Sequence, residues 1–536
     1  MRMNPSERNL LKSAVVYRVY PKSFFDSDGD GIGDLEGVKQ KLSYFRTLGA
    51  DIIALSSLFE SNYDFVGYGA TNFCRVNPAL GTQEDFDRLI EDAHEKGLRL
   101  FLCLSLFSTS AQHEWFEKSR VPSEMNPYRE YYIRRKGKNA RGTTPPDDRK
   151  NYWGDTAWSY DKSSGDWCLN EYGKDFPVLN YDNPRVRKEI LDVLRFWLGK
   201  GVDGFLFDRV HFGETYSLPI DKTSSSKEDF FESGAALCRI LTEAKEKIEE
   251  SFPVIITVDR EDPEFLRTLL VKNGGLADSL CIEAPISPLS LNRKCAFSQK
   301  KFLSDFSATQ AEPEDLNLSF EFENPTQQRV LALFETDFDR SAAAAKFLAT
   351  LHLTARTTPI LFQGAELGMT NSSGKKIREN ALFEQAGDTS CSPFPWDNTA
   401  NAGFSELTPY LRVDANYHKI NVAAEAADPE SVLSFYHKLI AFRKESSALL
   451  EGDFKDCSRG DFLLYLRASE SERFLIMANA SSRPANYSLP EELRSEVGVC
   501  EISNYSLVTK SIHSTIGLRA YEVRIYRLKK PLLALS

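Results

Sequence analysis

The stretch PRVRKEILDVLRFWLGKGVDGFLFD (residues 184–208) contains a helical pattern followed directly by an apolar strand pattern. Its first part predicts a helix over residues 184–198, and its second part predicts a strand over residues 202–208. A strand that is apolar along nearly its whole length is typical of a parallel sheet that is covered on both faces. This helix–strand pair therefore predicts an α/β fold.

The same alternation recurs on both sides of this stretch. We expect further strands over residues 15–20, 51–55, 98–106, 254–258 and 359–362. We expect further helices over residues 38–48, 86–93, 230–249, 342–353 and 432–443. Repeating units of this size indicate either an α/β barrel or an open doubly wound sheet, and the pattern alone leaves both open.

The alternation is interrupted once and ends before the C-terminus. Residues 108–180 are rich in Pro, Gly, charged and aromatic residues, including Trp153, Trp158 and Trp167, and predict an irregular inserted domain. From about residue 450 the apolar period switches to two, which predicts an all-β terminal domain. The expected domains are a first barrel part over 1–107, the insert over 108–180, a second barrel part over 181–449 and the β-domain over 450–536.

Composition excludes some classes of partner. The 536 residues carry a net charge of −11, which argues against a nucleic-acid partner. No run approaches the roughly 18 apolar residues that span a bilayer, and the N-terminus lacks the apolar core of a signal peptide. Five N-x-S/T sequons are nevertheless candidates for glycosylation, although chance alone would give about three; they begin at Asn317, Asn371, Asn479, Asn486 and Asn504.

A loop after the first strand carries acidic residues at alternating positions. Asp26, Asp28, Asp30 and Asp34 occupy positions 1, 3, 5 and 9, and Ile32 can add a backbone carbonyl. Alternating oxygen donors of this kind predict a Ca²⁺ site, with a solvated acidic turn as the alternative. The loop is not an EF-hand, because position 12 is a glycine and a strand precedes it.

Four motifs resemble the α-glucosidase and oligosaccharide-hydrolysing branch of the α-amylase family. They are VVYRVYPKSFFDSDGDGIGDLEGV (15–38), NYDNPRVRKEILDVLRFWLGKGVDGFLFD (180–208), TPILFQGAELGM (358–369) and SPFPWDNTANAGFSE (392–406). The resemblance runs over nearly the whole chain. It implies a (β/α)8 TIM barrel with a domain inserted after the third strand and a C-terminal antiparallel β-domain. In maltase-like members a loop similar to residues 26–34 binds Ca²⁺.

The resemblance also implies the position of the active site. Asp208, at the end of the fourth strand, matches the family's nucleophile, and Asp259 matches its acid/base, where the family has Glu. Tyr68 matches a tyrosine on which the sugar stacks. Retaining hydrolysis needs two carboxyl groups about 5–5.5 Å apart, so a side chain shortened by one methylene is expected to lower the rate.

Most other positions of the family's pocket differ. An arginine two residues before the nucleophile is Leu206, so Asp208 is expected to lack a cationic partner. The other replacements are found at Gly69, Cys103, Phe107, Ser108, Val178, Pro325 and Thr326. The lost His and Asp side chains would have bound sugar hydroxyls in the transition state, and one such group is worth about 10²–10³ in rate.

The pattern of losses also resembles the heavy subunits of heteromeric amino-acid transporters, which share Tyr-Gly at 68–69 and proline at 325. That resemblance implies a non-catalytic ectodomain that escorts a multi-spanning light chain. It would lie at the extracellular face of the plasma membrane if an anchor is missing from this chain, and otherwise be soluble. Two alternatives stay open: a retaining α-glucosidase with residual activity, and a soluble non-catalytic protein that holds a carbohydrate ligand on Tyr68 and the tryptophans of the insert.

Overall fold

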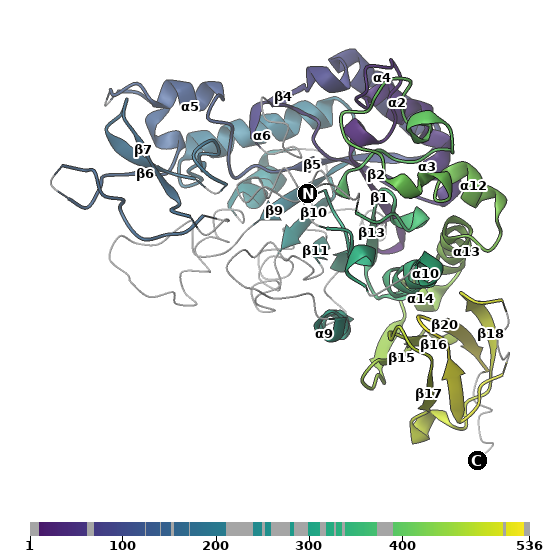
Figure 1. The fold of residues 1–536 in the computed structure, drawn as a ribbon. Coiled ribbons are helices and arrows are strands. Elements are labelled where there is room, and N and C mark those ends of the chain that lie inside the picture. The colour runs from purple at the N-terminus through teal and green to yellow at the C-terminus, as the bar shows by residue number, and fades with distance from the viewer. Residues whose placement is uncertain are drawn as a thin grey trace.

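Eight parallel strands close into a barrel at the centre of the molecule (Figure 1). The computed structural model describes residues 10–61, 69–123, 125–139, 141–151, 155–170, 172–210, 239–248, 252–258, 279–283, 299–310, 318–325, 328–334, 338–371, 390–506 and 511–529. Around the barrel the strands follow the order β1 (Val16–Val19), β13 (Thr358–Phe362), β12 (Leu318–Glu321), β11 (Ser279–Glu283), β10 (Val254–Val258), β9 (Gly204–Val210), β5 (Arg99–Leu104) and β2 (Ile52–Leu55). The expected TIM barrel is thus confirmed.

Amphipathic helices cover the outside of the barrel (Figure 1). The principal ones are α2 (Leu35–Gln40), α3 (Leu42–Leu48), α4 (Gln83–Glu95), α6 (Pro184–Gly199), α9 (Gln299–Gln310), α10 (Phe338–Thr354) and α13 (Val432–Lys444). Helix α6 begins where the Asn183 side chain accepts a hydrogen bond from the N–H of Arg185, with Pro184 in the first turn. Its apolar side, which includes Ile190, Leu194 and Trp197, is buried.

The barrel interior is apolar near the N-terminal ends of the strands and contains charged side chains near their C-terminal ends. Alternate residues of the strands point inward, and the apolar ones form a cluster of their own that includes Val16, Phe101, Leu206, Ile255 and Ile360. Packing is tight: a Cβ atom on Gly204 would lie 2.6 Å from the Phe101 ring. Further along the same strands, towards their C-terminal ends, several inward side chains are charged, among them Arg18, Asp208 and Glu321.

Between β5 and α6 the chain forms a small separate sheet, at the upper left of Figure 1. It consists of β6 (Arg134–Arg135), β8 (Asp166–Leu169) and β7 (Trp158–Asp161). Trp158 and Trp167 are buried, and their indole N–H groups donate to Asp147 Oδ1 at 2.6 Å and to the Gly142 carbonyl at 2.8 Å. These two tryptophans pack within the insert and are not presented as a sugar platform; Trp153 lies outside the described residues.

The C-terminal part is an antiparallel β-structure, shown in yellow in Figure 1. Its main sheet has the order β14 (Asp453–Asp456), β15 (Phe462–Ala468), β16 (Arg473–Asn479), β20 (Val523–Leu528) and β18 (Gly498–Ser503). A second sheet pairs β17 (Ala485–Ser488) with β19 (Thr515–Leu518). The sheet is tied to the barrel helices through the Tyr465 hydroxyl, 2.5 Å from Thr354 Oγ1, and through Arg467, which donates to the Thr354 carbonyl.

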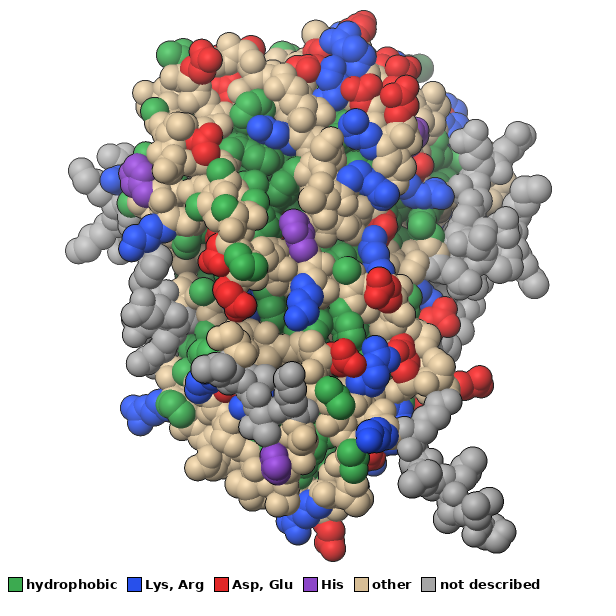
Figure 2. Space-filling view, turned by 90° about the vertical axis from the view of Figure 1, so that its right-hand side faces the viewer, with side chains coloured by type: hydrophobic (Ala, Val, Ile, Leu, Met, Phe, Trp, Pro, Cys, Tyr) green, Lys and Arg blue, Asp and Glu red, His purple; other side chains and the backbone are tan. Residues whose placement is uncertain are grey.

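Two expectations differ from the structure. The single helix expected over residues 38–48 is two helices, because the backbone at Lys41 leaves helical geometry (φ −99°, ψ 9°). The apolar pattern did not predict strands β11 and β12, although the resemblance implied eight strands. Within the described ranges no helix is both long and apolar enough to cross a membrane. On the face drawn in Figure 2, basic and acidic side chains are interspersed.

Candidate active site

Asp208 lies inside the barrel near the C-terminal end of β9, where catalytic groups of such barrels are found. Its carboxylate forms an ion pair with the guanidinium of Arg18 from β1. Both side chains are nearly inaccessible to solvent, with exposed fractions of 8% for Asp208 and 2% for Arg18. The two strands are not neighbours in the sheet, so this ion pair crosses the barrel interior.

Arg18 contacts three strands besides its own. Its Nε donates to Ser56 Oγ, just after β2, at 3.0 Å. Its Nη1 lies 3.1 and 3.0 Å from the two carboxylate oxygens of Glu321, the last residue of β12. Its Nη2 donates to Asp208 Oδ2 on β9. The planar guanidinium therefore fixes two carboxylates and a hydroxyl in one arrangement.

Cys103 on β5 lies beside this group. Burial raises the pKa of its thiol to about 12, although the nearby positive charge of Arg18 acts in the opposite direction. A thiol with so high a pKa is neutral near pH 7 and is a poor nucleophile. Cys103 is thus a small buried side chain near the C-terminal end of β5.

The expectation that Asp208 lacks a cationic partner was wrong. Leu206 is fully buried in the apolar part of the barrel, as its sequence position indicates, but Arg18 supplies the positive charge from another strand. Sequence reasoning missed both Arg18 and Glu321. One signal was available: an arginine in the middle of an otherwise apolar buried strand needs a buried anionic partner.

The other replaced positions are filled by packing interactions. Phe107 stacks edge-on with Tyr181, with ring centroids 5.7 Å apart, and the Tyr181 hydroxyl donates to the Leu106 carbonyl. Ser108 is buried and forms a β-bridge with Val178. The Pro325 carbonyl accepts a hydrogen bond from Ser390 Oγ at 3.3 Å. Three predicted positions lie outside the described residues: Tyr68, Asp259 and Thr326.

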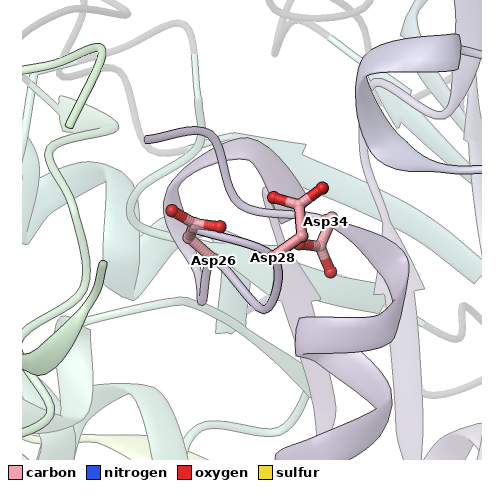
Figure 3. A group of neighbouring side chains, drawn as sticks. All are labelled: Asp26, Asp28 and Asp34. Atoms are coloured by element: carbon pink, nitrogen blue, oxygen red, sulfur yellow. The ribbon is translucent and has the colours of Figure 1, made fainter. Parts of the chain in front are cut away.

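The acidic loop brings three of its four aspartates together. Asp26, Asp28 and Asp34 each place a carboxylate oxygen within 4.8 Å of the other two (Figure 3). Asp30 is not part of this group, and its Oδ1 accepts a hydrogen bond from the N–H of Ile32 at 2.7 Å. Burial raises the pKa of Asp34 above its ordinary value, against the N–H groups that donate to it. A hard cation that prefers oxygen ligands fits this group of carboxylates.

The loop conformation is set by the same carboxylates. Asp26 accepts the N–H of Gly29 at 2.7 Å and that of Gly31 at 2.8 Å. Asp34 is the N-cap of α2 and accepts from the N–H of Gly37. Gly31 has φ +94°, and a Cβ atom there would lie 2.6 Å from the Thr408 carbonyl oxygen, so glycine is required at this position.

The predicted glycosylation positions differ in accessibility. Asn479 is fully buried, and its side-chain NH₂ group donates to the carbonyls of Arg483 and Arg519. Asn504 is 7% exposed and its NH₂ group is engaged in the same way. A glycan does not fit on either side chain in the folded protein. Asn486 is exposed on β17, Asn371 is half-buried, and Asn317 lies outside the described residues.

Comparison with known proteins gives matches over almost the whole chain. The family model described as the alpha-amylase catalytic domain matches residues 18–452. An oligo-1,6-glucosidase of Parageobacillus thermoglucosidasius is 30% identical, over 98% of this chain and 100% of its own length. The trehalose-6-phosphate hydrolase of Bacillus subtilis (strain 168) is 30% identical, over 97% and 98%.

Solved structures agree with these matches. The trehalulose synthase MutB from Pseudomonas mesoacidophila MX-45 superposes with a TM-score of 0.86 at 31% identity, covering 98% of this chain and all of that one. The isomaltulose synthase SmuA from Protaminobacter rubrum gives a TM-score of 0.87 at 28% identity, covering 97% and 99%.

These relatives contradict our expectation of a non-catalytic heavy subunit. Their names are those of enzymes that act on glucosides, and nothing in the matches connects the chain with an amino-acid transporter. The substitutions that suggested the heavy subunit are real, but they occur in a chain whose relatives are glycosidases along its full length. The chain belongs to the α-amylase family of glycoside hydrolases, in its maltase and oligo-1,6-glucosidase branch.

Proposed function

We propose that this protein is a retaining α-glucosidase that hydrolyses the α-glucosidic bond of short glucosides, with Asp208 as its nucleophile. The observation that carries the proposal is the ion pair between Arg18 and Asp208 at the C-terminal end of the barrel strands. A nucleophile must be held in a defined position to attack an anomeric carbon, and the Arg18 guanidinium donates a hydrogen bond to one oxygen of the Asp208 carboxylate. Relatives of similar length that are named oligo-1,6-glucosidases support the substrate class.

The proposed reaction has two steps. The Asp208 carboxylate attacks the anomeric carbon while an acid protonates the departing glycosidic oxygen, which leaves a covalent glycosyl-enzyme. Water, deprotonated by the same acid/base residue, then releases glucose with its configuration retained. We assign the acid/base role to Asp259, which directly follows Val258, the last residue of β10. Strand β10 pairs with β9, which carries Asp208, and Asp259 itself lies outside the described residues.

We expect a slower enzyme than its relatives. Ser108 and Pro325 stand where the resemblance places histidines that bind the sugar, and both are buried. Proline has no side-chain donor, and serine offers one hydroxyl on a side chain shorter than that of histidine. Each such loss lowers the rate by about 10²–10³, and the effects are not additive.

The acidic loop is the proposed site of a structural Ca²⁺ ion. Asp26, Asp28 and Asp34 would supply carboxylate oxygens, and the carbonyl of Ile32 and the side chain of Asp30 are further candidate ligands. The loop connects β1 to α2, so an ion there would hold the first βα connection in place. Its role would be structural, because the proposed chemistry needs only carboxyl groups.

Hydrolysis of 4-nitrophenyl α-D-glucopyranoside and of isomaltose by the purified chain tests the proposal. We expect release of glucose first as the α-anomer, observed by proton NMR, and loss of at least about 1,000-fold in kcat in Asp208→Asn. Asp192→Asn, on the exposed side of α6, is the matched control and retains wild-type activity. Activity that persists in Asp208→Asn would come from a contaminating enzyme or another residue, and would refute the assignment.

A further inference from the structure

We infer that Arg18 is the residue that positions the nucleophile. This inference rests on the proposed function, since a nucleophile needs positioning only in an enzyme. Arg18 comes from β1, whereas Asp208 lies on β9, and no strand-to-strand hydrogen bond joins these two strands among those described. The orientation of the Asp208 carboxylate is therefore set by a side chain that reaches it through the barrel interior.

The geometry of the guanidinium is the first argument. Arg18 donates from Nη1 to both oxygens of Glu321 at 3.1 and 3.0 Å, and from Nε to Ser56 Oγ at 3.0 Å. These contacts fix the plane of the guanidinium before Asp208 is considered. With the plane fixed, the N–H bonds of Nη2 have fixed directions, and Nη2 donates to Asp208 Oδ2. The arrangement fixes the position of one carboxylate oxygen of Asp208, which restricts the orientation of the carboxylate, as a near-attack geometry requires.

The gradient of burial is the second argument. The exposed side-chain fractions are 0% for Glu321, 2% for Arg18 and 8% for Asp208. Glu321 is the most deeply enclosed of the three, and Asp208 is the least. Asp208 is thus the member of the group with the largest exposed fraction, as the inference requires of the one that meets the substrate.

Another arginine of the chain has an almost inaccessible side chain and two carboxylate partners, but is far from Asp208 in the fold. Arg134, in the inserted sheet, pairs with Asp161 at 3.2 Å and Asp166 at 2.9 Å and donates to the Ser119 hydroxyl. Its side chain is 6% exposed. It also donates to the Ser164 hydroxyl at 2.8 Å, so that, like Arg18, it has two carboxylates and serine hydroxyls as partners, but it lies outside the barrel. Arg134 is the control for the general cost of removing a buried arginine.

The test compares Arg18→Gln, Arg18→Lys and Arg134→Gln with the wild type on 4-nitrophenyl α-D-glucopyranoside. We expect Arg18→Gln to lower kcat about 100-fold with KM changed less than about threefold, because the lost charge acts on the reacting carboxylate. Lysine restores the charge without the planar fork, so Arg18→Lys recovers at least about tenfold of that loss. Arg134→Gln lowers the midpoint of urea unfolding but leaves kcat within about twofold of wild type.

The outcomes separate the inference from the function on which it rests. Wild-type protein that hydrolyses no α-glucoside refutes the proposed function, and the role of Arg18 falls with it. If the wild type is active and Arg18→Gln leaves kcat unchanged or increases it, the role of Arg18 is refuted and the proposed function is not. Equal losses of kcat in Arg18→Gln and Arg134→Gln would show that Arg18 acts only through stability, which also refutes it. If Arg18→Gln does not fold, the comparison of Arg18→Lys with Arg134→Gln decides, since a positioning role lowers kcat only in the former.

Discussion

Arg18 and Glu321 lie 303 positions apart in the chain and meet in the barrel interior, where one guanidinium nitrogen donates to both oxygens of the carboxylate. Neither residue is accessible to solvent beyond 2% of its side chain. Burying a charge without a partner lowers the stability of the fold, so each of these residues offsets the cost of burying the other's charge. This pair links β1 to β12, strands that lie on either side of β13.

Removing one carboxylate of this group should destabilise the fold. We expect Glu321→Gln to lower the free energy of unfolding by about 3 kcal/mol, because Arg18 then keeps a buried charge with one carboxylate partner fewer. The measurement is urea unfolding followed by tryptophan fluorescence. Glu496→Gln, which breaks a partly exposed ion pair with Arg473, is the control and should cost less than about 1 kcal/mol. Equal costs for the two variants would contradict the importance given to the buried group.

We expect that the arginine facing Asp208 can be moved from position 18 on β1 to position 206 on β9. Leu206 points into the same interior and lies two residues before Asp208. Leu206→Arg alone should destabilise the protein by about 3 kcal/mol, because it adds a second buried charge to a filled core. Combined with Arg18→Gln the loss should be at least halved, since one cation again faces the carboxylates. Strictly additive losses in the double variant, measured by thermal unfolding, would contradict this exchange.

Elements of the fold that are determined by residues close together in the sequence were predicted, and those that depend on distant residues were not. Strand β10 and helix α13 were predicted to within a residue or two because apolar periodicity is a local signal. The break at Lys41 was missed because the apolar positions of α2 and α3 continue one helical pattern across it. Strand β11 was missed because its sequence, SLCIE, has a serine and a glutamate at its ends and only three apolar residues between them, so that closure of the barrel, rather than its own pattern, gives it partners.

The active site was less predictable than the fold. Asp208 could be placed from its motif, whereas its partner Arg18 is 190 positions away. A motif comparison tests for the arginine only at position 206, where relatives carry it. Because this chain has leucine there, the comparison led to the wrong expectation that Asp208 has no cationic partner. Only the closed barrel shows that inward-facing residues of β1 and β9 share one interior.

The free energy of unfolding should fall as the pH rises, because of the buried carboxyl group of Glu425 in helix α12 (Val422–Ala427). Burial raises its pKa from 4.5 to about 7, so the folded state holds a proton that the unfolded chain releases near pH 4.5. Stability from this group is fully present below pH 4.5 and is lost as the pH rises towards 7, by up to about 3 kcal/mol. Glu425→Gln keeps an oxygen that can accept the Leu433 N–H and removes the titration. We expect this variant to be more stable than wild type at pH 8 but not at pH 4.5, whereas Glu430→Gln, on the exposed surface, changes neither value. An unchanged stability difference at the two pH values would contradict the prediction.

The occupied glycosylation positions should be few if the chain is made in a glycosylating host. Asn479 and Asn504 have their NH₂ groups engaged by backbone carbonyls inside the β-structure, so a glycan there would prevent native packing. We expect mass spectrometry of tryptic peptides to show a glycan on Asn486 of the three C-terminal sequons and none on the other two. Asn479→Gln should lower the unfolding midpoint, whereas Asn486→Gln should not. A glycosylated Asn479 in folded protein would overturn the described packing.

The acidic loop offers a matched pair of substitutions for the proposed Ca²⁺ site. Asp28 belongs to the group of three close carboxylates and Asp30 does not, yet both are exposed and both accept a backbone N–H two residues on, which asparagine can also do. We expect Ca²⁺ to raise the thermal unfolding midpoint of the wild type and EDTA to lower it, because a ligand that binds only the folded state stabilises it. Asp28→Asn should weaken Ca²⁺ binding at least about tenfold in isothermal titration calorimetry, since it removes one of the three charges that face the ion. Asp30→Asn should weaken it less, because its carboxylate is not one of the three that lie together. Equal losses for the two variants would mean that the ion is held by the loop's overall charge rather than by these three carboxylates, and a wild type whose midpoint ignores both Ca²⁺ and EDTA would refute the site.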